Sequence, residues 1–200
     1  MRNLLTVLFL LASLPCAAQT VDMAGSVTQT SDTERTVIRV TGVITADVAA
    51  DFIEALERAP ATRPVVIELD SPGGYVKAGF AMVDTMLRYR STGRSIVTMV
   101  RRNSSCESMC FGVFMAGFPR RAEVGAYFMV HAPRDERSGM MSMRTTNEMI
   151  VRLIGLGTSQ AWIHTVAERG GFSGRTDFGA RAEELTRSGA NVVTELLAVH

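Results

Sequence analysis

The chain has 200 residues, of which 46% are hydrophobic and 20% charged, and its formal net charge is +1. This balance is typical of one globular domain with a sizeable core, and it excludes a disordered chain or a multi-pass membrane protein. Lys77 is the only lysine among the 21 basic residues; the arginines are scattered, and a pair such as Arg101-Arg102 is too short to follow a phosphate backbone. The composition offers no argument for nucleic acid binding.

The start of the chain has the pattern of a secretory signal peptide. Arg2 supplies the positive charge, and residues 4–14 form an apolar run too short to span a bilayer. The small residues that follow predict cleavage after Ala18, hence a signal peptide over residues 1–18 and a periplasmic or otherwise exported chain with no stable membrane span. A lipoprotein site at Cys16 fits less well, because proline precedes this cysteine where such sites have Gly, Ala or Ser.

Strands and helices are predicted to alternate through the rest of the chain. Residues 19–35 are polar and predict a loose N-terminal arm or an edge hairpin, and residues 134–147 are polar and Met-rich, as in a mobile excursion. Alternating or continuous apolar runs predict strands at residues 36–40, 65–69, 95–100 and 127–130. Helical spacing predicts one helix that starts at Thr45 or Asp47 and runs to about residue 58, and two more over residues 75–89 and 109–116. A further long helix is predicted after residue 147, up to about residue 168, with a break near Gly155 and Gly157. This rhythm indicates an α/β fold built from βαβ units with a mainly parallel sheet.

Three short motifs along this pattern carry the parts of a serine acyl-transfer site. They are residues 106–110, with Ser108 between two cysteines; residues 71–74, a Ser-Pro-Gly-Gly turn; and residues 129–131, which end in His131. A serine hydroxyl needs a neighbouring base, and an imidazole titrates near neutral pH. Each motif alone also has a structural explanation: a serine bonded to its own helix, a histidine satisfied by a carbonyl, and a tight strand-to-helix turn. Their order along the chain favours the catalytic interpretation.

The expected oxidation state of the cysteines depends on the export prediction. If Cys16 leaves with the signal peptide, Cys106 and Cys110 remain as an even pair in an oxidising compartment, which favours a disulfide over two buried free thiols. Two thiols without a further local ligand make only half a zinc site, so no metal is predicted. Four residues apart on a regular helix, the two Cα atoms would lie near the upper limit for a disulfide, so a distorted turn is expected.

The blocks 69–79, 84–86, 108–109 and 130–133 resemble the successive motifs of ClpP, a serine peptidase of the ClpP/crotonase fold. The Cys-x-Ser-x-Cys segment on an exported chain is more similar to a group of ClpP-like proteins outside the cytoplasm. The resemblance implies a repeated βαβ spiral over residues 36–200, with Ser108 as nucleophile and His131 as base. It assigns the oxyanion hole to the N–H groups of Gly74 and Met109, and substrate contact to Gly73.

Two departures from the ClpP pattern bear on catalysis. Gly170 stands where relatives have the aspartate that orients the histidine, and Asp177 is the nearest replacement. Glu107 replaces a small apolar residue, and Ser104-x-x-Glu107 has the spacing of a capping box. A helix that begins at Ser104 would use the Met109 N–H internally, so the capping and catalytic interpretations compete.

Three other residues are set aside. Lys77 could suggest the Ser–Lys dyad of signal-peptide peptidases of this fold, but it follows the glycine turn, which favours a surface or rim position. His164 and His200 lack comparable flanking motifs and are expected to be structural or exposed.

The resulting prediction is an exported serine hydrolase, most simply a peptidase, that needs no cofactor and acts on short peptides or unfolded chains. The ClpP resemblance implies self-association into a homo-oligomer, while export argues against an ATP-driven partner. The alternative is a catalytically impaired ClpP-like scaffold that binds peptides, favoured by Gly170 and Glu107. An acyl-CoA enzyme of the crotonase branch is weaker, because a coenzyme A supply outside the cytoplasm is doubtful.

Overall fold

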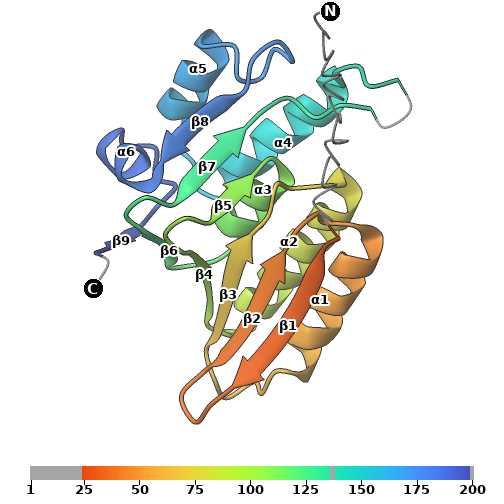
Figure 1. Cartoon of the computed structure of the whole chain (residues 1–200), viewed down its shortest axis with the longest axis vertical. Helices are drawn as coiled ribbons and strands as arrows, with labels where there is room; N and C mark the ends of the chain where they lie inside the picture. Colours follow the sequence, from red (N-terminus) through yellow and green to blue (C-terminus); the bar gives the residue numbers. More distant parts are fainter. Residues whose placement is uncertain (1–23, 136–137, 199–200) are drawn as a thin grey trace, which may run out of the picture.

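The computed structural model describes residues 24–135 and 138–198, so the predicted signal peptide and the first part of the predicted arm lie outside the described residues. The chain forms two sheets, with helices packed on and between them (Figure 1). The larger sheet has the strand order β1 (Ser26–Ser31), β2 (Thr36–Thr41), β3 (Val65–Asp70), β4 (Ile96–Val100), β6 (Arg120–Glu123) and β9 (Glu195–Leu197). The smaller sheet has the order β5 (Ser105–Glu107), β7 (Tyr127–Val130) and β8 (Phe178–Arg181).

The pairing confirms the prediction of a mainly parallel α/β fold. In the larger sheet β1 alone is antiparallel to its neighbour, and in the smaller sheet β5 and β7 are parallel while β8 runs antiparallel to β7. The two sheets meet where Ser71, just after β3, forms a parallel bridge to Cys106 in β5. This junction places the Ser-Pro-Gly-Gly turn beside the cysteine motif.

In the part of the chain that the structure describes, the helices that cover the sheets are α1 (Ala46–Arg58), α2 (Val76–Ser91), α3 (Met109–Met115), α4 (Met143–Gly155), α5 (Gln160–Glu168) and α6 (Ala182–Arg187). In Figure 1, α1 and α2 lie together on one face of the larger sheet. The Thr45 hydroxyl accepts a hydrogen bond from the Val48 N–H and so begins α1, as one of the two predicted caps would do. All seven residues of α3 are buried, which agrees with its almost wholly apolar sequence.

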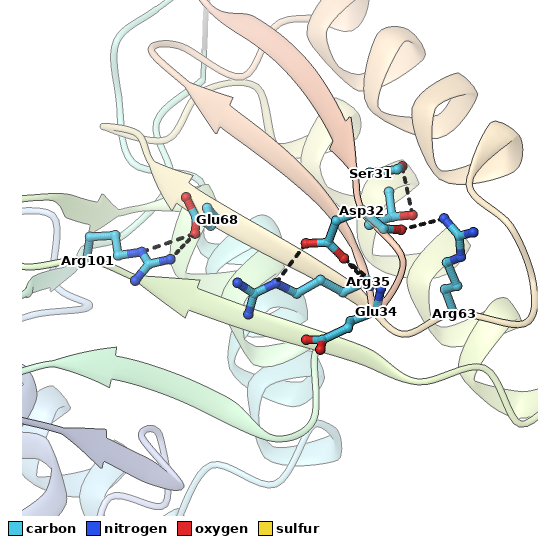
Figure 2. Close-up of polar contacts among 8 residues, drawn as sticks. Ser31, Asp32, Glu34, Arg35, Arg63, Glu68 and Arg101 are labelled. Atoms are coloured by element: carbon cyan, nitrogen blue, oxygen red, sulfur yellow. Dashed lines mark hydrogen bonds and ion pairs between the residues drawn. The ribbon is translucent and has the colours of Figure 1, made fainter.

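Of the two predictions for residues 19–35, an arm or an edge hairpin, the described part agrees with the hairpin. β1 pairs with β2 through a turn in which Asp32 accepts hydrogen bonds from the N–H groups of Glu34 and Arg35 (Figure 2). These two bonds, more than the nearby arginines, hold the pKa of Asp32 below its usual value. Arg63, which precedes β3, donates to the Asp32 carbonyl and ties the turn to the body of the sheet.

A second polar cluster in Figure 2 lies at the carboxyl ends of the central strands. Arg101, directly after β4, forms an ion pair with Glu68 on β3, as Figure 2 shows. It forms a second ion pair with Glu123 on β6. The bond to Glu68 makes the largest contribution to raising the Arg101 pKa. Glu123 also accepts the Arg102 N–H at 2.8 Å, and this bond is the main cause of its lowered pKa.

The prediction of a mobile excursion over residues 134–147 is wrong for its last residues, because α4 begins at Met143 with Ser142 as its cap. The break between α4 and α5 falls at residues 156–159, as predicted from Gly155 and Gly157. No helix in the described part of the chain is both long and apolar enough to cross a membrane.

Candidate active site

Ser108 lies at a sharp bend between β5 and α3. Its backbone has φ 53° and ψ −120°, a conformation that residues other than glycine rarely adopt. The Ser108 N–H donates to the Met129 carbonyl on β7 at 2.8 Å, and the Ser108 carbonyl accepts the Phe111 N–H at 3.1 Å. The bend is therefore held by the sheet on one side and by the helix on the other.

The capping-box alternative is wrong for this structure. Helix α3 begins at Met109, and residues 105–107, which would form the first turn of a helix capped by Ser104, form strand β5. The Ser105 N–H donates to the Asp70 side chain, and the Glu107 N–H donates to the Ser71 carbonyl. These bonds to the end of β3 keep the segment extended up to the residue before Ser108.

His131 directly follows β7, the strand parallel to β5. The register pairs Glu107 with Met129, so Ser108 and His131 emerge at the same end of the smaller sheet. His131 Nε2 lies 2.7 Å from Ser108 Oγ, which is within hydrogen-bonding distance. The serine and histidine that the sequence predicted to meet are thus in contact, and both side chains are half-buried.

The glycine turn lies against this pair. The Ile44 N–H donates to the Gly73 carbonyl and the Ile44 carbonyl accepts the Tyr75 N–H, which leaves the intervening Gly74 N–H out of this bridge. Gly73 has φ +92°, and a methyl group placed on it would lie 2.6 Å from the Glu107 carbonyl oxygen and 2.7 Å from Ser108 Cβ. Only glycine permits so close an approach of the two segments.

Two backbone N–H groups are candidates for an oxyanion hole. Met109 is the first residue of α3, so its N–H precedes the first intrahelical hydrogen bond. Within residues 24–135 and 138–198, neither the Met109 N–H nor the Gly74 N–H donates to a protein acceptor. The Met109 side chain is fully buried and packs on Gly79 of α2, which anchors the start of α3.

A disulfide joins Cys106 and Cys110 across Ser108, with their Cα atoms 5.1 Å apart. The sequence predicted that this bond would need a departure from a regular helix, and the structure has one. The two cysteines do not share a helix, because Cys106 lies in β5 and Cys110 in α3. Both are fully buried.

Ser108 and His131 open into a cavity of about 830 Å³ between α2 and the segment around α4. Its other lining residues are Gly74, Tyr75, Val76, Lys77, Phe80, Ala81, Asp84, Pro133, Arg134, Asp135, Ser142, Thr145 and Glu148. Arg152 bridges the two sides, with its guanidinium 2.7 Å from Asp84, 3.5 Å from Glu148 and 4.1 Å from the centre of the Phe80 ring. Lys77 lines the cavity, in agreement with the predicted rim position.

Sequence reasoning did not find most of this lining. The spacing of Lys77, Phe80, Ala81 and Asp84 on α2 marks one helix face and could have found that wall. The opposite wall comes from residues 133–135 and from residues 142–148, and beyond Pro133 no motif distinguishes it.

Asp177 lies close to the histidine along the sheet. The last β7–β8 pair is Val130 with Phe178, and one further step of this antiparallel register would pair His131 with Asp177. The carboxylate is exposed, and none of the hydrogen bonds found in the described residues joins it to His131. Gly170 has φ +86° and belongs to the turn after α5, where a side chain would collide with Thr176.

The remaining candidates lie as follows. Glu107 is half-buried, and no ion pair of the described residues involves it. His164 lies on α5 with 72% of its side chain exposed and pairs with Glu168, which agrees with an exposed residue outside the site. His200 is outside the described residues.

The comparison with known families decides the assignment. The model of the Clp protease family matches residues 22–156, a segment that contains the glycine turn, Ser108 and His131. The chain belongs to the Clp protease family. Membership supports a serine peptidase at the level of enzyme class, and the matched segment ends before Asp177.

Solved structures agree on the fold of this Clp protease family member. A point mutant of ClpP1 from Listeria monocytogenes is similar with a TM-score of 0.61 and 19% identity, over 82% of this chain and 92% of that one. At this identity the likeness shows the ClpP/crotonase-like fold alone. None of the curated proteins matches by sequence.

Proposed function

We propose that the chain is an exported serine peptidase in which Ser108 is the nucleophile and His131 the general base. The observation that carries this proposal is the 2.7 Å separation of Ser108 Oγ and His131 Nε2 at the mouth of a cavity. A serine hydroxyl becomes a useful nucleophile only when a base within hydrogen-bonding distance accepts its proton.

The reaction follows from this pair and the two backbone donors. Ser108 Oγ attacks the peptide carbonyl while Nε2 of His131 takes the hydroxyl proton, and the carbonyl oxygen becomes an oxyanion. In this proposal the N–H groups of Gly74 and Met109 donate to it; removal of one such donor costs on the order of 3 kcal/mol in other serine enzymes. The imidazolium then protonates the leaving amine, and a water activated by the same histidine hydrolyses the acyl-enzyme.

We assign the third position of the triad to Asp177. The β7–β8 register supports this assignment, because directly opposed residues of an antiparallel pair lie on the same face of a sheet. In this assignment the Asp177 carboxylate accepts a hydrogen bond from Nδ1 of His131 and so holds the ring in the tautomer that leaves Nε2 free to accept a proton.

The substrates that fit are short peptides or already unfolded chains. The cavity is open at the surface of the chain and offers an apolar wall from Val76 and Phe80 beside Ser108. Export is supported by the signal-like start and by the Cys106–Cys110 disulfide, since structural disulfides form in oxidising compartments. Outside the cytoplasm no ATP-driven unfolding partner is expected. Self-association is supported by exposed apolar side chains near α4: Met140, Met143 and Val151.

A serine-directed fluorophosphonate probe tests the proposal. We expect wild type to be labelled at Ser108, as identified by peptide mapping, and Ser108→Ala to lose labelling. His131→Ala should lower the labelling rate by several orders of magnitude, while His164→Gln, a histidine change outside the site, should leave it unchanged. Labelling of Ser108→Ala at the wild-type rate, or no labelling of folded wild type, would contradict the proposal.

The second candidate is a ClpP-like scaffold that binds peptides without cleaving them. Two observations favour it: the Glu107 carboxyl group next to Ser108, and the exposed position of Asp177. A carboxylate close to the reacting serine would oppose the negative charge that develops there. Folded wild type that binds an unfolded peptide, but neither reacts with the probe nor releases cleavage products, would support this function.

A further inference from the structure

The disulfide between Cys106 and Cys110 encloses the proposed nucleophile. Ser108 is the central residue of the five-residue segment that the bond closes, with β5 on one side and α3 on the other. The position of the bond indicates a part in arranging Ser108.

The bond lies where two local structures compete. Ser108 adopts a positive φ that L-residues rarely adopt, so this conformation needs support from its surroundings. The preceding sequence favours a different arrangement, because Ser104-x-x-Glu107 has the spacing of a capping box, and such a box would begin the helix about one turn earlier. In that longer helix the Met109 N–H would bond to the Ser105 carbonyl, and Ser108 would lie within a regular turn.

The observed contacts exclude that longer helix as long as β5 stays extended. The Ser105 carbonyl accepts the Ser71 N–H, and the Ser108 N–H donates to the Met129 carbonyl. Cys106 is in the middle of β5, and its bond to Cys110 ties this short strand to the first turn of α3. A three-residue strand alone is a weak restraint, since it has few hydrogen bonds.

We propose that formation of the Cys106–Cys110 disulfide selects the bend over the longer helix and so brings Ser108 Oγ into contact with His131. The two cysteines are positioning residues, and the site is assembled when the chain is oxidised. This inference rests on the proposed peptidase function. It implies that the chain is at least tenfold less active while reduced and gains activity in an oxidising compartment.

The Cys106–Cys110 bond forms by thiol–disulfide exchange. Cys106 and Cys110 lose two electrons and two protons as their S–S bond forms, and a disulfide-bearing oxidant is reduced to two thiols. Both sulfur-bearing side chains are fully buried in the folded chain, which shields the finished bond from attacking thiolates. The bond therefore acts once, during maturation, rather than as a reversible switch.

The test compares the double variant Cys106→Ala/Cys110→Ala with wild type and with Leu56→Ala. Leu56 is fully buried in α1, and its truncation provides a matched loss of stability outside the proposed site. We expect the fluorophosphonate labelling rate of the double variant to fall at least tenfold, with Leu56→Ala unchanged. The affinity for a peptide boronate, which forms a tetrahedral adduct on serine, should fall by a similar factor in the double variant alone.

Amide hydrogen exchange reports the conformation directly. The Met109 amide should exchange more slowly in the double variant, because the longer helix gives it an acceptor. If the double variant does not fold, wild type folded in dithiothreitol and then treated with oxidised glutathione should gain labelling as its two thiols disappear.

The outcomes separate this inference from the proposed function. Wild type that labels at Ser108 together with a double variant that labels equally fast would overturn the positioning role and leave the peptidase intact. Labelling of reduced wild type at the rate of oxidised wild type, before any thiol is lost, would overturn it as well. Oxidised, folded wild type that never labels would instead remove the proposed function.

Discussion

Substitution of Gly73 by alanine tests the packing of the glycine turn against the Ser108 bend. A Cβ atom at this position would lie 2.6 Å from the Glu107 carbonyl oxygen, 2.7 Å from Ser108 Cβ and 2.9 Å from the Met109 nitrogen. These separations are well inside van der Waals contact, so either the turn or the bend must move by roughly 0.5 to 1 Å. Because displacements of about 1 Å can cost roughly 100-fold in rate, we expect the labelling rate to fall about 10- to 100-fold.

Gly93→Ala is the matched control. Gly93 has φ +87°, close to the +92° of Gly73, but a Cβ atom there would meet nothing within 4 Å. Both variants carry the backbone cost of alanine at positive φ, about 1–2 kcal/mol. Only Gly73→Ala adds overpacking, typically a further 1–3 kcal/mol.

Urea unfolding and fluorophosphonate labelling measure the two effects separately. We expect Gly93→Ala to label like wild type, and Gly73→Ala to be less stable than Gly93→Ala as well as slower to label. Equal stability and equal labelling rates for the two variants would refute the close packing of the turn on Ser108. The stability comparison holds whether or not the chain is an enzyme.

Three further predictions follow from the same contacts. Asp177→Asn should lower the labelling rate by about 10- to 10⁴-fold, depending on how much of the histidine orientation this carboxylate provides; an unchanged rate would remove Asp177 from the triad. Removing the disulfide in Cys106→Ala/Cys110→Ala should lower the free energy of unfolding by roughly 2 kcal/mol, as expected for a short closed loop, and calorimetry that finds no loss would contradict a stabilising bond. Glu123 has a pKa lowered mainly by the Arg102 N–H and further by Arg101, so its contribution to stability should be present above the unfolded-state pKa of about 4.3 and lost as pH falls through the lower folded-state value. In urea unfolding at pH 7, wild type should therefore have a higher free energy of unfolding than Glu123→Gln, and this difference should shrink toward pH 3. A difference that does not change with pH would show that the ionised form of Glu123 does not stabilise the fold.

Local sequence determined the elements that are long or strongly patterned. Helix α1 begins at one of its two predicted caps, Thr45, and buries the apolar face that its spacing predicted. The apolar strands β3 and β4 lie side by side in the parallel sheet, as their continuous hydrophobic runs indicated. In these segments propensity, capping and burial all favour the same structure, so distant residues are not needed to decide it.

Tertiary structure alone decided the short strands and the details of the site. β5 and β9 have three residues each, too few for a period to be recognised, and they exist because neighbouring strands supply hydrogen bonds. The capping-box spacing at Ser104 would favour a helix that begins there, but the pairing of β5 and the disulfide stabilise an extended segment instead. Sequence order indicated that Ser108 and His131 belong to one site, but their 2.7 Å contact depends on the β5–β7 register, which brings together residues 23 positions apart. Local sequence patterns reflect interactions between residues that are close together in the chain. The geometry of this site is instead set by hydrogen bonds and packing between segments that are far apart in the chain.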